Sequence, residues 1–150
     1  MVPVAESGRS ALQISVEKFG SLPSAMSFRH EVADKLDPWR DVLADCTTLR
    51  IRARALESST TAVEIVLLER DGAAWGTNVP LTTQWQIVGI PLRSLRYFGH
   101  WADTPASRGG PDDFLHPADL VAMSACFGAW LYPGHVAEPH TIEIESVTVE

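Results

Sequence analysis

The feature that most constrains the fold of this chain is a series of short apolar or alternating segments, each closed by turn residues. In most of them apolar and polar side chains alternate with a period of two, which is typical of β-strands with one buried face, and helical periodicity is weak throughout. The eight segments are 12–17, 26–29, 50–55, 63–67, 73–79, 85–92, 120–132 and 140–149. We therefore expect an all-β fold, a sandwich or jelly roll of about eight antiparallel strands, in one domain that spans residues 1–150.

Turn chemistry and loop length add detail to this expectation. The Asp71-Gly72 pair predicts a hairpin between the fourth and fifth strands. Residues 32–46 could hold one short helix, and residues 91–95 could form a single helical turn. The long polar connection 97–119 breaks the rhythm, and connections of that length are often functional. The alternative, that it packs on a neighbouring domain, stays open.

Composition excludes several classes of partner. The formal net charge is −7, which argues against nucleic acid and anionic membrane surfaces, because both attract clustered positive charge. No run approaches the ~20 apolar residues of a membrane span, and residues 1–9 lack the basic start and apolar core of a signal peptide. Cys46 and Cys126 have no metal or redox spacing, so a disulfide and two buried free thiols both stay open.

The order of the motifs resembles that of a known group of sandwich domains. The motifs are Leu-Arg-Ile-Arg-Ala-Arg (49–54), Val-Glu-Ile-Val-Leu-Leu-Glu-Arg-Asp-Gly (63–72), Trp-x-x-Val-x-Ile-Pro-Leu-x-x-Leu (85–95), His-Pro-Ala-Asp-Leu (116–120) and Ile-Glu-Ile-Glu-Ser-Val-Thr-Val (142–149). Over residues 48–149 this succession resembles the galactose-binding-like jelly rolls that occur as carbohydrate-binding modules beside glycoside hydrolases and polysaccharide lyases.

The resemblance implies a glycan ligand, bound either on the concave sheet or at the loop rim. It also implies an extracellular or periplasmic location and a catalytic domain in the same parent chain. Many members of this group hold one structural calcium ion away from the ligand, so the resemblance implies that calcium could be bound here as well.

Aromatic side chains are the first candidates for sugar recognition, because the C–H faces of a pyranose stack on a ring while polar groups bind the hydroxyls. Of the five tryptophans, Trp85 opens its strand and is expected in the core. Trp75 follows the Asp71-Gly72 turn, where packing and binding are both open. Trp101, in a polar loop, would contact a ligand or dock on another domain, and Trp39 would anchor its own loop.

The segment 120–132 carries two further aromatic candidates. Its alternation puts larger apolar residues on one face, which we expect in the core, and small residues followed by Trp130 and Tyr132 on the other. Small side chains beside two aromatic rings would form a shallow floor with an aromatic wall, which suits a sugar. The alternative is a close-packed inner sheet; we favour the binding interpretation.

Arginines occupy every second position from Arg50 to Arg54 and thus share one strand face. Their planar forks, Arg52 and Arg54 in particular, could grip an acidic glycan. The stronger alternative is a solvated row neutralised by cross-strand carboxylates, for which Glu64 and Glu69 are available. The binding interpretation requires that the arginines share a groove with Trp130.

Metal and catalytic motifs are weak. Asp112, Asp113 and Asp119 could contribute to a calcium site, as could Glu17 with Glu143, although calcium takes six to eight oxygens and a solvated acidic loop is the alternative. None of the five histidines shows metal-site spacing. The sequence contains no nucleophile elbow, phosphate-binding loop or dinucleotide glycine motif.

These patterns predict a noncatalytic carbohydrate-binding module that holds a poly- or oligosaccharide by aromatic stacking and hydroxyl hydrogen bonds, without a cofactor beyond calcium. The ligand-binding candidates are Trp101, Trp130, Tyr132, Trp75, Arg52, Arg54 and His100. One alternative is an accessory sandwich that packs on a catalytic domain, with Trp101 at the interface. The other is a jelly-roll polysaccharide lyase, in which Tyr132, Arg52 and a histidine would act on a uronate.

Overall fold

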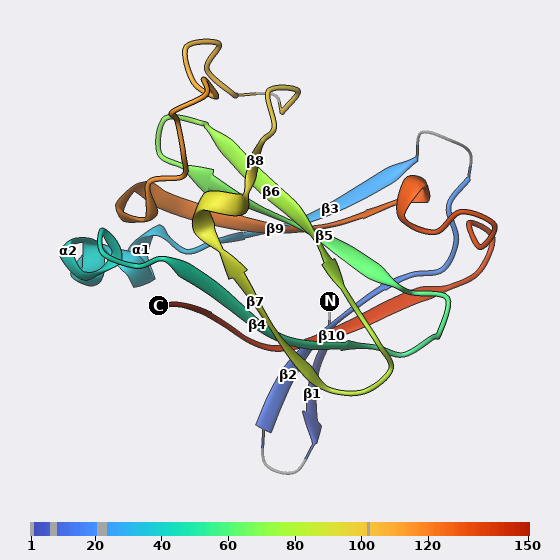
Figure 1. The fold of residues 1–150 in the computed structure, drawn as a ribbon. Coiled ribbons are helices and arrows are strands. Elements are labelled where there is room, and N and C mark those ends of the chain that lie inside the picture. The colour runs from blue at the N-terminus through green and yellow to red at the C-terminus, as the bar shows by residue number, and fades with distance from the viewer. Residues whose placement is uncertain (1, 7–8, 21–23, 102) are drawn as a thin grey trace.

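The computed structural model describes residues 2–6, 9–20, 24–101 and 103–150 and contains two antiparallel sheets packed face to face (Figure 1). Sheet A holds β1 (Val2–Glu6), β2 (Arg9–Val16), β10 (His140–Val149), β4 (Thr48–Ala55) and β7 (Gln86–Pro91), in that order. Sheet B holds β3 (Ala25–Glu31), β9 (Leu120–Gly128), β5 (Ala62–Glu69), β6 (Ala74–Pro80) and β8 (Arg96–Tyr97). The expected β-sandwich is confirmed.

The described residues form ten strands, compared with the expected eight or so. The two additional strands are β1, which pairs with β2, and β8, which contributes two residues beside β6. Helical turns lie in both predicted places. The first place holds α1 (Ala33–Leu36), the 3-10 turn η1 (Asp37–Trp39) and α2 (Arg40–Leu43), and the second holds η2 (Leu92–Ser94). A further 3-10 turn, η3 (Pro117–Asp119), precedes β9. None of the helices in the described ranges is long and apolar enough to cross a membrane.

The core lies between the sheets and follows from the alternation of the strands. In β4, Leu49, Ile51, Ala53 and Ala55 point inward and are buried, whereas the arginines between them point outward. Because successive side chains of a strand point to opposite faces, one apolar set per strand is enough to close a two-layer core. β5 differs, since both of its faces are buried from Ile65 onward.

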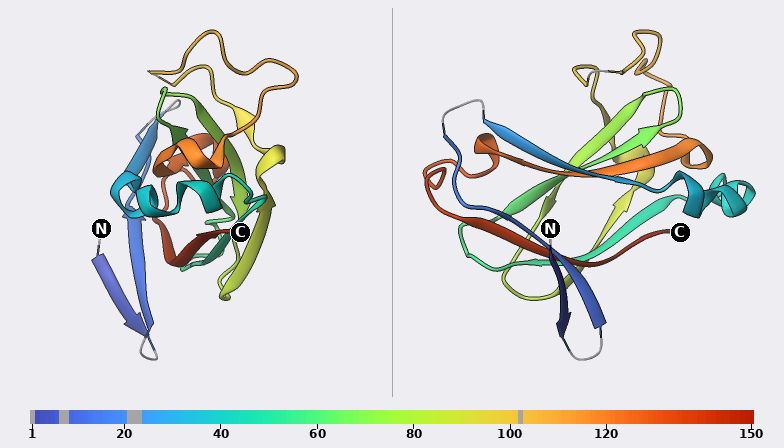
Figure 2. Two further views of the ribbon diagram at one scale, coloured as in Figure 1. Left: turned by 90° about the vertical axis from the view of Figure 1, so that its left-hand side faces the viewer. Right: turned by 180° about the vertical axis from the view of Figure 1, so that it is seen from behind.

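Part of the outer face of sheet B, over β5 and β9, is buried because a second apolar layer covers it. Val66 and Leu68 of β5 pack there with Ala122 and Cys126 of β9 and with Phe98. Phe98 begins the long connection between β8 and η3, which stands over the β6 and β8 side of sheet B (Figures 1 and 2). The connection 97–119 therefore forms part of the tertiary structure and gives sheet B a partly walled outer surface.

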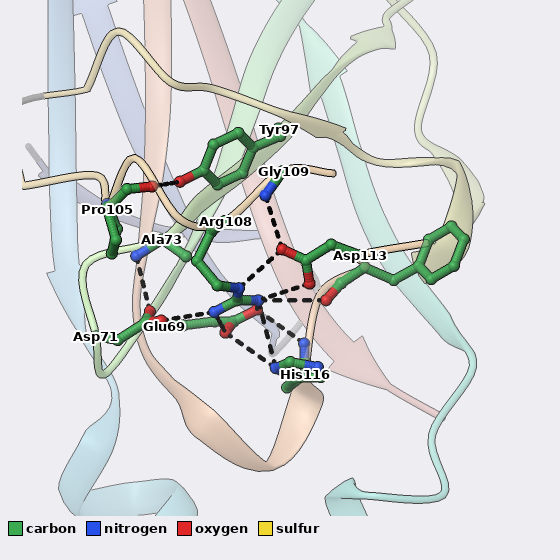
Figure 3. A network of polar contacts seen from close by, with 10 residues as sticks. Glu69, Asp71, Ala73, Tyr97, Pro105, Arg108, Gly109, Asp113 and His116 are labelled. Carbon is green, nitrogen blue, oxygen red and sulfur yellow. Dashed lines mark hydrogen bonds and ion pairs between the residues drawn. The ribbon is translucent and has the colours of Figure 1, made fainter. Parts of the chain in front are cut away.

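Arg108 fastens this connection to the sheet (Figure 3). Its guanidinium donates to carboxylate oxygens of Glu69, Asp71 and Asp113, at distances of 2.6 to 3.3 Å. The hydrogen bond from Arg108 lowers the pKa of Asp113, and burial would otherwise raise it. The side chain of Glu69 is almost fully buried, so the pair is shielded from water and holds the loop more firmly than a surface ion pair would.

Candidate functional site

A groove with a volume of about 660 Å³ opens on the outer face of sheet B, beside the 97–119 connection. Its walls and floor come from β3, β5, β8, β9, the start of the connection and the turn after β9. The lining residues are Ala25, Met26, Ser27, Glu64, Arg96, Tyr97, Phe98, His100, Trp101, Cys126 and Trp130. Aromatic, charged and small side chains therefore meet in one depression.

The floor of the groove is set by strand register. Cys126 of β9 lies opposite Ser27 of β3 on one side and opposite Glu64 of β5 on the other, so the three side chains cross the sheet in one row. The Cys126 thiol donates to Ser27 Oγ at 3.5 Å, and burial raises its pKa to about 11. Cys126 is therefore a neutral thiol at physiological pH and lacks the thiolate that a nucleophile needs.

Glu64 is the carboxylate of the groove. Burial raises its pKa, and the positive charges of His100 and Arg96 act in the opposite direction. A half-buried carboxylate can accept hydrogen bonds from ligand hydroxyls, while Arg96 can donate them. The three groups arrive from β5, β8 and the loop, so only the folded chain brings them together.

Trp130 forms one wall, and its side chain is 48% exposed. It belongs to η4 (Ala129–Leu131), directly after β9. The six-membered ring of its indole lies over Gly128, at the place where any other residue would carry a Cβ atom. Trp101 also lines the groove, and its backbone N–H donates to the Phe98 carbonyl oxygen at 3.1 Å. The ring centroid of Phe98 lies 5.2 Å from that of His100.

Three of the seven predicted binding residues meet in this groove: Trp101, Trp130 and His100. The small residues of β9 that we expected beneath Trp130 do face the same side, because Cys126 and Gly128 lie below the groove. The structure thus gathers these side chains; their contact with a ligand stays a prediction.

Tyr132 requires a correction, because it is 1% exposed and lies in the core. The alternation of β9 ends at Gly128, and η4 then turns the chain, so Tyr132 no longer shares a face with Trp130. Its ring stacks on His140 at 3.7 Å between centroids, and its hydroxyl donates to the Ala62 carbonyl oxygen at 2.6 Å. No face of this ring is open to a sugar.

Trp75 is likewise a core residue, 3% exposed. Its ring packs 5.0 Å from that of Tyr97, and the guanidinium of Arg108 lies 5.8 Å from its centroid. Because Trp75 points inward from β6, its ring is not available to a ligand on the outer surface. It supports the sandwich and the Arg108 contact beneath the loop.

Arg52 and Arg54 lie on the outer face of sheet A, on the other side of the molecule from Trp130. Arg52 pairs with Glu145, and Arg54 pairs with Glu143 at 2.6 Å. Their guanidinium carbons lie 5.1 and 4.7 Å from the ring centroid of Trp85. The condition for the binding interpretation, a groove shared with Trp130, is therefore not met, and the favoured alternative of a neutralised row holds for Arg52 and Arg54. The neutralising carboxylates come from β10 instead of Glu64 and Glu69.

The same separation excludes the catalytic set of Tyr132, Arg52 and a histidine that was considered for a lyase. Tyr132 is in the core and Arg52 is on sheet A, so no histidine can join both at one site. Sequence reasoning had instead missed Glu64, Arg96 and Ser27 as groove residues, although it placed Cys126 in the floor beside Trp130. The alternation of β5 contained the signal for Glu64, whereas the two-residue strand β8 left none for Arg96.

One group of three side chains among the described residues could offer ligand atoms to a metal ion. Glu69, His116 and Asp119 bring their ligand atoms within 4.8 Å of one another. However, Arg108 lies 3.3 Å from His116 Nδ1 and binds both oxygens of Glu69, so the guanidinium is already the cation of this cluster. A calcium ion, which takes six to eight oxygens, would have to displace it.

The other acidic candidates for calcium do not come together. Asp113 binds Arg108, and Asp112 is exposed near the surface of the loop. Gln13, and not Glu17, lies opposite Glu143, which pairs with Arg54. Cys46 and Cys126 are both free thiols, so the disulfide is not formed.

Comparison with known proteins gives structural matches alone, since no family model and no curated protein sequence matches the chain. A family 11 carbohydrate-binding module from Clostridium thermocellum, in complex with a β-1,3-1,4-mixed-linked tetrasaccharide, superposes with a TM-score of 0.71 at 9% identity. That match covers 99% of this chain and 79% of the other. A family 30 carbohydrate-binding module superposes with a TM-score of 0.63 at 16% identity, covering 97% and 69%. The chain thus shares the β-sandwich jelly-roll fold of these carbohydrate-binding modules.

Proposed function

We propose that this chain is a noncatalytic carbohydrate-binding module that holds a poly- or oligosaccharide in the groove of sheet B. The observation that carries the proposal is the pairing of a half-exposed indole, Trp130, with a second tryptophan, Trp101, around polar groups in one depression of about 660 Å³. Solved sandwiches of the same fold include modules of this class, one of them in complex with a tetrasaccharide.

Binding would combine two kinds of contact. The open side of Trp130 offers apolar surface to the C–H face of a sugar ring, and burying that surface excludes water. Glu64 accepts hydrogen bonds from hydroxyls, and Arg96 donates them to hydroxyl or ring oxygens. Glu64 is partly buried, whereas Arg96 is exposed. Each hydrogen bond to the ligand replaces one with water and therefore gives orientation more than affinity.

A binding role fits the groove better than hydrolysis does. Glycoside hydrolysis usually needs two carboxylates that flank the scissile bond. Among the residues that line the groove, Glu64 is the one carboxylate, and the neutral thiol of Cys126 is no nucleophile. A catalytic domain in the same parent chain would then supply the chemistry, and such a pairing would place the protein outside the cytoplasm.

Affinity electrophoresis against plant, algal and microbial polysaccharides tests the proposal. We expect retardation by at least one neutral glycan, and loss of that retardation in Trp130→Ala. Trp39→Ala is the matched control, because Trp39 is 60% exposed and lies in η1, outside the groove. If no polysaccharide retards the protein, or if both variants behave alike, the groove is not a glycan site.

An accessory role is the second candidate, and exposed apolar residues outside the groove favour it. Trp39 and Val42 are both more than half exposed and lie three residues apart in the segment from η1 to α2. Exposed apolar pairs of this kind can mark a surface that packs on another domain. Comparing thermal stability of the chain with and without its neighbouring domain, in wild type and in Trp39→Ala, separates this role from glycan binding.

A further inference from the structure

A second cavity, of about 570 Å³, lies between the two sheets at the end of the sandwich beside α1. It shares no lining residue with the groove of sheet B. Its walls are apolar and come from both layers, with Leu12, Leu49 and Val147 from sheet A and Leu67 and Met123 from sheet B. Leu36 of α1 also lines it.

This end of the core is incompletely closed. Several aliphatic residues that pack against the core are only partly buried, and many of these gather around this cavity: Leu12, Leu36, Met123, Val147 and Val149. Apolar surface left in contact with water is unfavourable in proportion to its area. An apolar molecule that entered between the sheets would remove this surface from water without moving the strands.

The mouth of the cavity carries a positive group. Lys35 lies on α1, and its Nζ is 3.3 Å from Nε2 of His30; both side chains are exposed and both line the cavity. The acidic side chains nearby have cations of their own: Glu145 pairs with Arg52 and Glu31 pairs with Arg29. Asp34, beside Lys35 on α1, is exposed to solvent.

We propose that this cavity binds a single-chain amphiphile with an anionic head, of the chemical class of free fatty acids. The tail would lie between the sheets, and the carboxylate would meet the ammonium of Lys35, which has two N–H groups beyond the one directed at His30. Size and lining fit this class, because small-molecule sites usually occupy 300–1,000 Å³ and combine apolar walls with a few polar groups.

Titration calorimetry with dodecanoate, kept below its micelle concentration at pH 7, tests the proposal. We expect saturable binding of one molecule per chain. Val147→Phe and Met123→Trp each fill the cavity and should abolish it, and two variants guard against a folding failure in one. Lys35→Glu should weaken binding about two- to fivefold, as expected for an exposed ion pair. Lys18→Glu, which removes the other lysine far from the mouth, should not change it.

The outcomes separate this site from the glycan groove. The proposed site would be refuted if the wild type showed no saturable binding of dodecanoate. It would also be refuted if folded Val147→Phe and Met123→Trp bound dodecanoate as tightly as the wild type does. Equal affinity for dodecyltrimethylammonium would refute the role of Lys35, and binding to anionic phospholipid vesicles but not to monomeric dodecanoate would assign the surface to a membrane instead. Trp130→Ala should retain dodecanoate binding, so failure of the glycan proposal leaves this one standing, and the reverse also holds.

Discussion

Gly128 allows Trp130 to form a wall of the groove, and replacing it with alanine should weaken glycan binding. A Cβ atom at Gly128 would lie less than 3.0 Å from three atoms of the six-membered ring of the indole, closer than Cβ atoms approach other heavy atoms. Overpacking of this kind costs about 1–3 kcal/mol when the neighbours cannot move. Trp130 is half exposed and can move outward, so the ring should yield before the strand does.

We therefore expect the free energy of unfolding of Gly128→Ala to fall by less than about 1 kcal/mol, below the range for closed cores. Displacement of the ring should remove its contact with the sugar and lower glycan affinity about tenfold, which corresponds to ~1.4 kcal/mol. Affinity electrophoresis measures the glycan affinity, and thermal unfolding measures the stability. Tryptophan emission reports whether the indole has moved into water.

Two controls make the experiment decisive. Gly110→Ala places its Cβ in open space, with no heavy atom within 4 Å and no positive φ, so it should leave binding and emission unchanged. In the double variant Gly128→Ala/Trp130→Phe, the smaller ring should remove the clash, and the stability lost in the single variant should return. Wild-type affinity and unchanged emission in Gly128→Ala would refute the proposed role of the indole wall.

Three further predictions follow from the contacts described above. Arg108→Ala should lower the free energy of unfolding by about 3 kcal/mol, because it leaves the buried carboxylate of Glu69 without its partner. Arg70→Ala, whose side chain is 65% exposed, is the control in thermal melts. Equal melting temperatures of the two variants would show that the loop does not depend on the Arg108 contact. Tyr132→Phe should lower the free energy of unfolding by about 0.5–1.5 kcal/mol through loss of the hydrogen bond to Ala62, and it should leave glycan affinity unchanged. Weakened glycan binding in this variant would indicate that Tyr132 contributes to the site. Alkylation of Cys126 by iodoacetamide, followed by mass spectrometry, should be slow at neutral pH and accelerate as the pH approaches the thiol pKa of about 11; a bound glycan should slow it further, and an unprotected Cys126 in the presence of saturating glycan would place the ligand elsewhere.

The β-strands could be predicted from the sequence because their signal is local. Alternation in β4 and β5 specifies which side chains share a face, and Asp71-Gly72 specifies the hairpin that joins β5 and β6. The short helical pieces between β3 and β4 were predicted for the same reason. β8 could not be predicted, because a two-residue strand has no periodicity and exists only through its pairing with β6.

The candidate site was predictable only in part, and two residues show why. Trp130 was correctly placed beside the small residues of β9, whereas Tyr132, two residues later, was assigned to the same face and lies in the core. The difference is a single turn of 3-10 helix after Gly128, which changes the direction of the chain without a marked sequence signal. The arginine row shows the other limit: alternation tells which residues share a face but not to which sheet that face belongs.

The sequence by itself determined an all-β sandwich and a negative net charge, because strand formation and net charge depend on composition and on near neighbours along the chain. Only the tertiary structure decided where function can reside. Glu64, Arg96 and the pair Cys126 and Trp130 come from three separate parts of the chain. They meet because β5 pairs with β9 and β6, because β6 pairs with β8, and because Arg108 holds the 97–119 connection over the sheet. Register and loop placement depend on contacts between residues distant in sequence, so no local pattern contains them.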